Sequence, residues 1–204
     1  MSLLIQHPAI LIVAAGQSKR LGTPKQLLKF EGESLINRLI HTIITAVDFP
    51  ITLVVGFHAE MIQQQLLTNN VNCVINHEWE EGMASSIRLG TEHIIQNDPL
   101  VDGIMVVVCD QPYINAGHIK ALLEEQHKTG KSIVACYYAD VLGTPALFHK
   151  SMFGALMSLK GDVGARKIIQ DKSPEVAKLH FAQGALDIDT LADYEQLIKA
   201  SSTK

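Results

Sequence analysis

Apolar and polar residues follow two different periods along this chain. Short, compact apolar runs predict strands, and longer segments with apolar residues three to four positions apart predict amphipathic helices. The predicted strands span 9–14, 51–56, 72–76, 103–109 and 132–138, with weaker candidates at 145–149 and 176–181. The predicted helices span 34–47, 58–68, 84–96 and 115–128.

The order of these segments predicts the fold class. Strands and helices alternate, and residues 104–108 are apolar at every position, which is typical of a parallel strand covered by helices on both faces. We therefore expect an α/β fold, a three-layer α/β/α sandwich around a Rossmann-like, mostly parallel sheet. The chain contains no evident linker, repeat or low-complexity tract, so a single domain over residues 1–204 is expected.

Composition narrows the range of partners and compartments. The chain has 204 residues, 47% of them hydrophobic, and a net charge of −4, which gives no indication of nucleic acid or a membrane surface as a partner. The first eight residues lack the features of a signal peptide, and no apolar stretch approaches the roughly 18 residues needed to cross a bilayer. Three cysteines without a CxxC pair favour reduced thiols, so a cytoplasmic protein is expected.

The first candidate site is the loop AAGQSKRLGTPKQ, residues 14–26, which follows the first predicted strand. Ligands of open α/β sheets bind beyond the carboxyl ends of the strands, and a glycine-containing loop there can present backbone N–H groups to an anion. A polyphosphate is the ligand that fits, although a solvated basic loop is the alternative. The five residues between Gly16 and Gly22 exclude a Walker loop, and the chain has no GxGxxG fingerprint. The loop carries three cations and no acid: Lys19, Arg20 and Lys25.

Acidic residues follow the central strand and precede the last predicted helix, 191–200. Asp110 comes directly after the central strand, where a carboxylate is placed to ligate magnesium beside a polyphosphate or, alternatively, to cap the next helix. Asp187 and Asp189 form a second pair, and alternation would put both on one side of a strand. Asp189 is also a candidate cap for helix 191–200, so both roles stay open at this point.

Residues 11–28 resemble the LAAGxSxRxGxxKxLL signature of nucleotidyltransferases that activate sugar phosphates, polyol phosphates or the molybdenum cofactor. In that family the loop backbone holds the nucleoside triphosphate, and an Arg and a Lys that match Arg20 and Lys25 contact its phosphates. Val13 replaces the usual leucine, a conservative departure. The resemblance implies further nucleotide contacts by Ala14, Ala15, Gly16 and Ser18.

Later segments resemble the molybdenum cofactor cytidylyltransferases in the same order along the chain, from about Ile10 to Tyr194. A DQP motif and a DIDT-like segment imply that Asp110 and Asp189 share Mg²⁺, with Asp187 and Asp193 less favoured. Residues 76–90 match NxxWxxGMxxSxxxG, which implies that Gly82 and Ser86 lie near the base and ribose. Capping of helix 84–96 is the alternative for Ser85 and Ser86, and Trp79 either packs or lines the pocket.

The acceptor is expected in the C-terminal half, and the nucleotide in the N-terminal half. A GxP turn and a GDxGAR motif, in the order found in the resembling enzymes, imply acceptor contacts by Thr144, Pro145, Asp162 and Arg166. Asp162 is alternatively a cap for a helix that opens within the GDxGAR motif.

The resemblance implies transfer of CMP from CTP to the phosphate of molybdopterin, with release of pyrophosphate and without a protein nucleophile. Arg20, Lys25 and Asp110 would be catalytic, and Mg²⁺ the cofactor. Ala15 stands where related guanylyltransferases have glycine, and its methyl would narrow the base pocket in favour of a pyrimidine. Two alternatives stay open: a nucleotidyltransferase for a sugar or polyol phosphate, and a non-catalytic cofactor-binding chaperone for a molybdoenzyme client.

Overall fold

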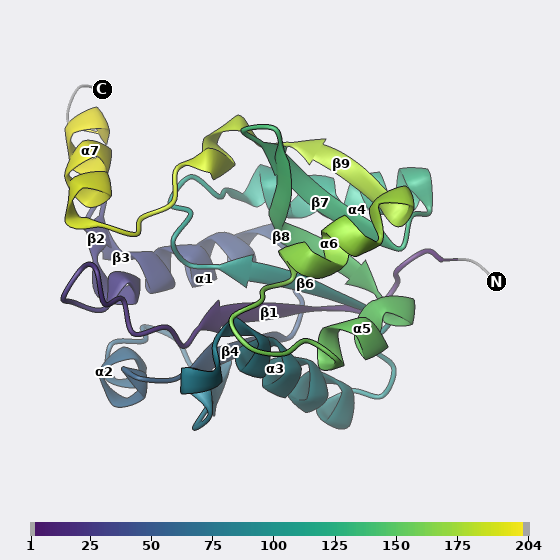
Figure 1. The fold of residues 1–204 in the computed structure, drawn as a ribbon, viewed down its shortest axis with the longest axis horizontal. Coiled ribbons are helices and arrows are strands. Elements are labelled where there is room, and N and C mark those ends of the chain that lie inside the picture. The colour runs from purple at the N-terminus through teal and green to yellow at the C-terminus, as the bar shows by residue number, and fades with distance from the viewer. Residues whose placement is uncertain (1–2, 202–204) are drawn as a thin grey trace.

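A seven-stranded sheet runs through the computed structural model, which describes residues 3–201 (Figure 1). Its strand order is β5-β4-β1-β6-β8-β7-β9. The strands are β1 (Pro8–Ala14), β4 (Ile51–Val55), β5 (Asn72–Ile75), β6 (Gly103–Val108), β7 (Ile133–Tyr138), β8 (Val141–His149) and β9 (Val176–His180). The short strands β2 (Lys29–Phe30) and β3 (Glu33–Ser34) form a separate hairpin.

The sheet is mostly parallel, as the sequence predicts. Strands β5, β4, β1 and β6 pair in parallel, as do β7 and β9, whereas β8 runs antiparallel to both of its neighbours. A tight turn reverses the chain between β7 and β8, because Ala139 and Asp140 both have positive φ, 45° and 60°. Strand β8 begins at Val141, four residues before the predicted start at 145. The prediction began late because Gly143 and Pro145 are uncommon inside strands and are typical of a turn.

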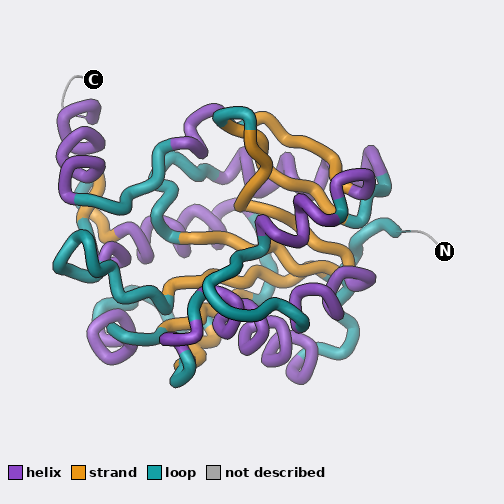
Figure 2. The backbone as a smooth tube through the Cα atoms, in the orientation of Figure 1, coloured by secondary structure: helices purple, strands orange, loops and turns teal. Residues whose placement is uncertain are grey.

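Helices cover both faces of the sheet (Figure 2). They are α1 (Leu35–Ala46), α2 (Ala59–Gln64), α3 (Met83–Asn97), α4 (Ala116–Thr129), α5 (Phe153–Met157), α6 (Arg166–Asp171) and α7 (Leu191–Ser201). Of the five predicted helices, the last being 191–200, four have nearly the predicted bounds. The fifth, α2, ends at Gln64 and not at 68 as predicted. The Asn37 amide donates to the Gln65 carbonyl at 2.8 Å and accepts from Leu67 N–H at 3.2 Å, in a bend that replaces the next helical turn.

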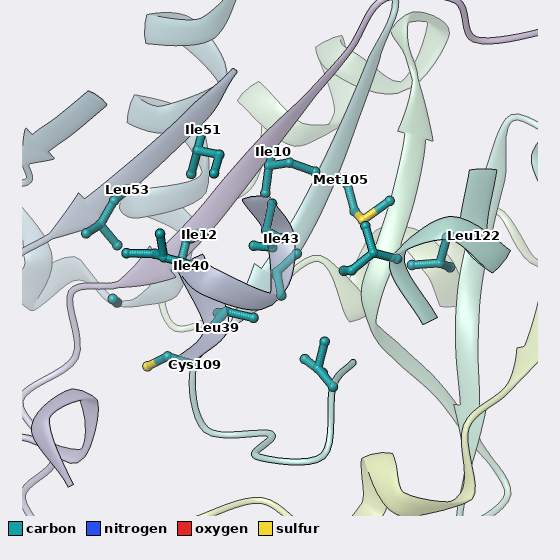
Figure 3. Packing of buried hydrophobic residues seen from close by; sticks show 14 of the residues in the cluster. Ile10, Ile12, Leu39, Ile40, Ile43, Ile51, Leu53, Met105, Cys109 and Leu122 are labelled. Carbon is teal, nitrogen blue, oxygen red and sulfur yellow. The ribbon is translucent and has the colours of Figure 1, made fainter. Parts of the chain in front are cut away.

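Alternating residues of the central strands pack against opposite helix layers, which confirms the three-layer sandwich. On one face, Ile10, Ile12 and Met105 pack against α1 and α4 (Figure 3). On the other face, Leu11 and neighbouring apolar residues pack against α3, α5 and α6. Helix α3 lies close to the sheet because position 90 is glycine: a Cβ there would come within 2.2 Å of Leu11 Cδ1.

Helix α7 packs on the β2–β3 hairpin at one end of the molecule (Figure 1). The contact buries Phe30 and Leu35 against Ile188 and Leu197. The segment just before α7 is thereby brought back across the fold to the end of β6, where the Ile188 N–H donates to the Asp110 carbonyl at 3.0 Å. Within residues 3–201, no helix is both long and apolar enough to cross a membrane.

Candidate functional site

A cavity of about 360 Å³ opens beyond the carboxyl ends of β1 and β6. Its walls come from the loop after β1, the segment after β5, the end of β6 and Asp162. The structure therefore brings together most of the predicted nucleotide-binding residues along this cavity. Those that line it are Ala14, Ala15, Gly16, Ser18, Lys25, Gly82 and Ser86.

The loop after β1 is held in shape by side chains from within it. Ser18 has a φ of 55°, and its hydroxyl accepts a hydrogen bond from the Lys25 backbone N–H at 3.1 Å. Gln26, only 1% exposed, donates its side-chain amide to the carbonyls of Ala14 at 2.8 Å and Gly16 at 3.2 Å. Sequence reasoning missed Gln26, because its partners are backbone carbonyls that no residue pattern reveals.

Four predicted residues meet in a chain of ion pairs beside the cavity. Lys25 Nζ lies 2.5 Å from Asp110 Oδ2 and 3.1 Å from Asp189 Oδ1, while Arg20 Nη2 lies 2.8 Å from Asp189 Oδ2. The predicted cations and acids, 85 to 169 residues apart in sequence, are therefore neighbours in space. The Lys25 and Asp110 side chains are largely buried, whereas Arg20 and Asp189 are more exposed.

The charges of this cluster control one another's pKa values. Burial alone would lower the pKa of Lys25, but attraction and hydrogen bonding to Asp110, aided by Asp189, raise it above its ordinary value. Burial opposes ionisation of Asp189 as well, yet Lys25 and Arg20 lower its pKa. For Asp187, desolvation and the like charges of Asp110 and Asp189 outweigh the attraction of Lys25 and raise the pKa to about 6. The ammonium of Lys25 and the carboxylate of Asp189 are thus firmly charged at neutral pH.

The donor set fits a magnesium ion that shares its ligands with a phosphate. Magnesium is usually held by one or two carboxylates, with water and phosphate oxygens completing the shell. Asp110 Oδ1 is buried and has no hydrogen-bond partner within residues 3–201, so one carboxylate oxygen is available. Among those residues no group of three or more His, Cys, Asp or Glu side chains is arranged to hold a metal. Asp110 and Asp189 would therefore hold the ion together with substrate oxygens.

The capping alternatives for these acids are wrong. The N-cap of helix α4 is Asn115, whose side chain accepts from His118 N–H at 3.1 Å, so Asp110 is not its cap. Before α7, the Asp193 carboxylate accepts from the backbone N–H groups of Asp189 at 3.2 Å and Thr190 at 2.7 Å. The Asp189 carboxylate is therefore left for Lys25 and Arg20. The predicted strand around Asp187 and Asp189 is also wrong, because residues 186–190 form no strand.

The segment after β5 is organised by a buried amide. Asn76, 3% exposed, donates its side-chain amide to Ser85 Oγ at 2.8 Å and Ser86 Oγ at 2.9 Å. Neither serine caps α3, because the helix begins after Gly82. Gly82 has a φ of 115°, and a Cβ there would lie 2.5 Å from Asp162 Cα, so this position requires glycine. Asn76 therefore positions the two serines. It is part of the motif at residues 76–90, but nothing in the sequence indicates this role.

The four predicted acceptor residues are not brought to one surface of the cavity. Asp162 lines the cavity, whereas Thr144, Pro145 and Arg166 are not among the residues that line it. The predicted cap by Asp162 is wrong, because α6 begins at Arg166 after Ala165 and has no side-chain cap.

The hydroxyl of a half-buried tyrosine lies beside one of the remaining acceptor candidates, Thr144. Tyr138 donates its hydroxyl to the Thr144 carbonyl at 3.2 Å and accepts from Gln111 Nε2 at 3.2 Å. Burial raises the pKa of Tyr138, and the charges of Asp187 and Arg166 act on it too. Tyr138, which sequence reasoning missed, therefore links the end of β7 with the DQP segment after β6.

A cation-bearing loop after the first strand, close to an acid beyond the end of the central strand, defines an α/β protein with a site suited to a polyphosphate ligand. Within that class, the chain belongs to the family of MobA-like NTP transferase domains, whose family model matches residues 10–177. The nucleotidyltransferase resemblance seen in the sequence is thus confirmed at the level of the family. The choice of base and acceptor stays a prediction.

Relatives and solved structures match the chain over nearly its whole length. The chain is 27% identical to nicotine blue oxidoreductase of Paenarthrobacter nicotinovorans (92% of this chain, 94% of that protein). It is 26% identical to purine catabolism protein PucB of Bacillus subtilis (93% and 95%). The structure of Rv0371c from Mycobacterium tuberculosis H37Rv superposes with a TM-score of 0.84 at 27% identity (96% and 98%), and its manganese complex with 0.80 at 24% identity (96% and 100%).

Proposed function

We propose that this protein transfers CMP from CTP to the terminal phosphate of molybdopterin and releases pyrophosphate. The observation that carries the proposal is the position of the Lys25 ammonium between Asp110 and Asp189, beside the loop that follows β1. Lys25 and Asp110 line the cavity at the edge of the sheet where ligands of α/β folds bind, and Asp189 pairs with both Lys25 and Arg20. A protein that only held a cofactor would not need this paired arrangement.

The reaction requires positioning and charge neutralisation more than a protein nucleophile. An oxygen of the acceptor phosphate attacks the α-phosphorus of CTP, the bond from that phosphorus to the bridging oxygen breaks, and pyrophosphate leaves with the electron pair. Lys25 and Arg20 exchange their carboxylate partners for phosphate oxygens and stabilise the charge that develops there. Mg²⁺ held by Asp110 and Asp189 would neutralise the α-phosphate and assist the departure of pyrophosphate.

The assignment of the two substrates rests on separate residues. Ala15 lines the cavity where we place the base, and its methyl leaves less room than a glycine would, which favours cytosine. The description of the family as MobA-like supports a molybdopterin acceptor. We place this acceptor between Asp162 and the surface around Thr144, Pro145 and Arg166. The manganese complex of Rv0371c supports a divalent cation in this fold.

Pyrophosphate release tests the proposal directly. The purified protein is incubated with magnesium, each of the four ribonucleoside triphosphates, and either molybdopterin or a panel of sugar and polyol phosphates. We expect turnover with CTP and molybdopterin, and a roughly 10²- to 10³-fold lower kcat in Asp110→Asn, because one charge that stabilises the transition state is lost. Asp171→Asn is the matched control, since this acid only pairs with Lys167 on the surface of α6.

The alternatives predict different results in the same experiment. Turnover of a sugar or polyol phosphate without turnover of molybdopterin would replace the proposed acceptor. A chaperone for a molybdoenzyme would bind the pterin tightly without turnover, and Asp110→Asn would leave its function unchanged.

A further inference from the structure

Trp79 lines the cavity but does not contribute to the hydrophobic core. It lies in the short 3-10 turn Trp79–Glu81 after β5 and is half-buried. Among the described residues, 3–201, none of the three buried hydrophobic clusters includes it. A large aromatic side chain that is only half-buried and borders a ligand cavity leaves a ring surface for a ligand.

Neighbouring residues fix the indole ring beside the loop after β1. The ring of Phe57 meets Trp79 edge to face at 5.0 Å and 69°. The Phe57 N–H in turn donates to the Ala15 carbonyl at 3.3 Å, and the His58 ring contacts the Gln17 carbonyl at 3.2 Å. The orientation of Trp79 is therefore tied to the loop that we propose holds the triphosphate.

The close approach of Trp79 to Ala15 depends on a glycine. A Cβ at Gly56 would lie 2.8 Å from Ala15 Cβ and 2.8 Å from Trp79 Cβ, well inside van der Waals contact. The Cβ atoms of Ala15 and Trp79 therefore both lie close to Gly56, which has no side chain to keep them apart. This convergence places the aromatic ring on the same wall of the cavity as the residue that we expect to limit the size of the base.

The sheet order separates this wall from the charged cluster. Trp79 follows β5 and Asp110 follows β6, and these strands lie on opposite sides of β1, three strand spacings or roughly 14 Å apart. The cations and carboxylates gather on the β6 side. A nucleotide with its phosphates at Lys25 and Asp110 therefore has its base at the β5 end of the cavity.

From these observations we infer that Trp79 is the stacking platform for the nucleobase. The inference rests on the proposed nucleotide-binding function and adds the residue that holds the base. Base–aromatic stacking is tolerant of base identity, so Trp79 supplies affinity, whereas Ala15 discriminates between bases.

The chain contains one tryptophan, so its fluorescence reports on this residue alone. CTP and inorganic tripolyphosphate are titrated separately in magnesium buffer, and calorimetry measures their binding independently. We expect CTP to quench the emission, and tripolyphosphate, which has no base, to bind without quenching. CTP binding with unchanged emission, or equal quenching by tripolyphosphate, would overturn the stacking role while the nucleotide site stands. If no nucleoside triphosphate bound by calorimetry, the proposed function itself would fail.

Substitutions give a second readout. Trp79→Phe keeps an aromatic face and should hold CTP within about threefold of the original affinity. Trp79→Leu should weaken CTP binding roughly 5- to 100-fold and leave tripolyphosphate binding unchanged. Tyr137→Leu is the control, because this half-buried ring lies on β7 outside the cavity lining. Thermal unfolding verifies that each variant is folded, and unaltered CTP affinity in a folded Trp79→Leu protein would refute the assignment.

Discussion

At the scale of single residues, Ala15 is the position on which we propose that the choice of base depends. The structure adds a restriction: Ala15 is only 4% exposed, and its methyl packs beside Gly56, so little of it is free to touch a ligand. We expect Ala15→Gly to shift the ratio of kcat/KM for CTP over GTP toward GTP by at most about tenfold. Ala135→Gly, in the buried strand β7, controls for the loss of a methyl elsewhere. An unchanged ratio would move base selection to another residue.

Single residues also differ in whether their place in the candidate site could be predicted from the sequence. Lys25 and Asp110 could be singled out because charged residues in segments that follow buried strands have few structural roles and must face solvent or a ligand. Asp189 follows no strand and was singled out only by the resemblance of residues 187–190 to a family motif. Gln26 and Asn76 were not, since their importance comes from hydrogen bonds to backbone carbonyls and to two serines in folded geometry. Residues that act chemically leave a pattern in the sequence, whereas residues that position them leave none.

At the scale of elements, an ion pair joins the start of α3 to the loop that carries Asp162. The Glu81 carboxylate accepts from both terminal nitrogens of Arg88, at 2.7 and 2.6 Å, and from the Gly161 N–H at 3.0 Å. Arg88 also donates to the Leu159 carbonyl at 2.8 Å. We call this group of Glu81, Arg88 and their backbone partners the latch. It connects the wall that we assign to the nucleotide with the loop that we assign to the acceptor.

The latch predicts a pH-dependent contribution to stability. Hydrogen bonds from Arg88 and Gly161 lower the pKa of Glu81 to about 2, so the stabilisation is complete above its unfolded value of 4.5 and disappears as pH falls toward 2. We expect Glu81→Gln to lower the urea midpoint at pH 6, with the difference from the original protein shrinking between pH 4.5 and 2. Glu125→Gln, which removes a longer pair at 3.8 Å, should have little effect. A difference that stays constant with pH would contradict an electrostatic latch.

Two elements could not be fully predicted from the sequence, for different physical reasons. Helix α5 has only five residues, too few for an amphipathic period to be seen. Strand β8 pairs with β6 and β7 through backbone groups, and this pairing tolerates a glycine and a proline that break the local strand pattern. The long, periodic helices and the uniformly apolar strands were predictable, because burial alone dictates their composition.

At the scale of the whole molecule, the sheet crosses the boundary between the two proposed halves. Strand β6, which ends at Val108, two residues before Asp110, pairs with β8, and β8 in turn pairs with β7 and β7 with β9. The helix layers are shared too, since α3 and α5 pack on one another on the same face. The surfaces that we assign to the nucleotide and the acceptor are therefore two regions of one sheet, joined by strand pairing.

We accordingly propose that residues 1–204 fold as one domain, and the unfolding transition tests this. Tryptophan emission reports the N-terminal half through Trp79, while circular dichroism at 222 nm reports helices from both halves. In urea the two signals should give the same midpoint and slope, because breaking the β6–β8 pairing exposes both helix layers at once. Asp171→Asn should keep them coincident. Two separated transitions would mean that the halves are independent units, and the transfer site would then lie at a boundary between domains.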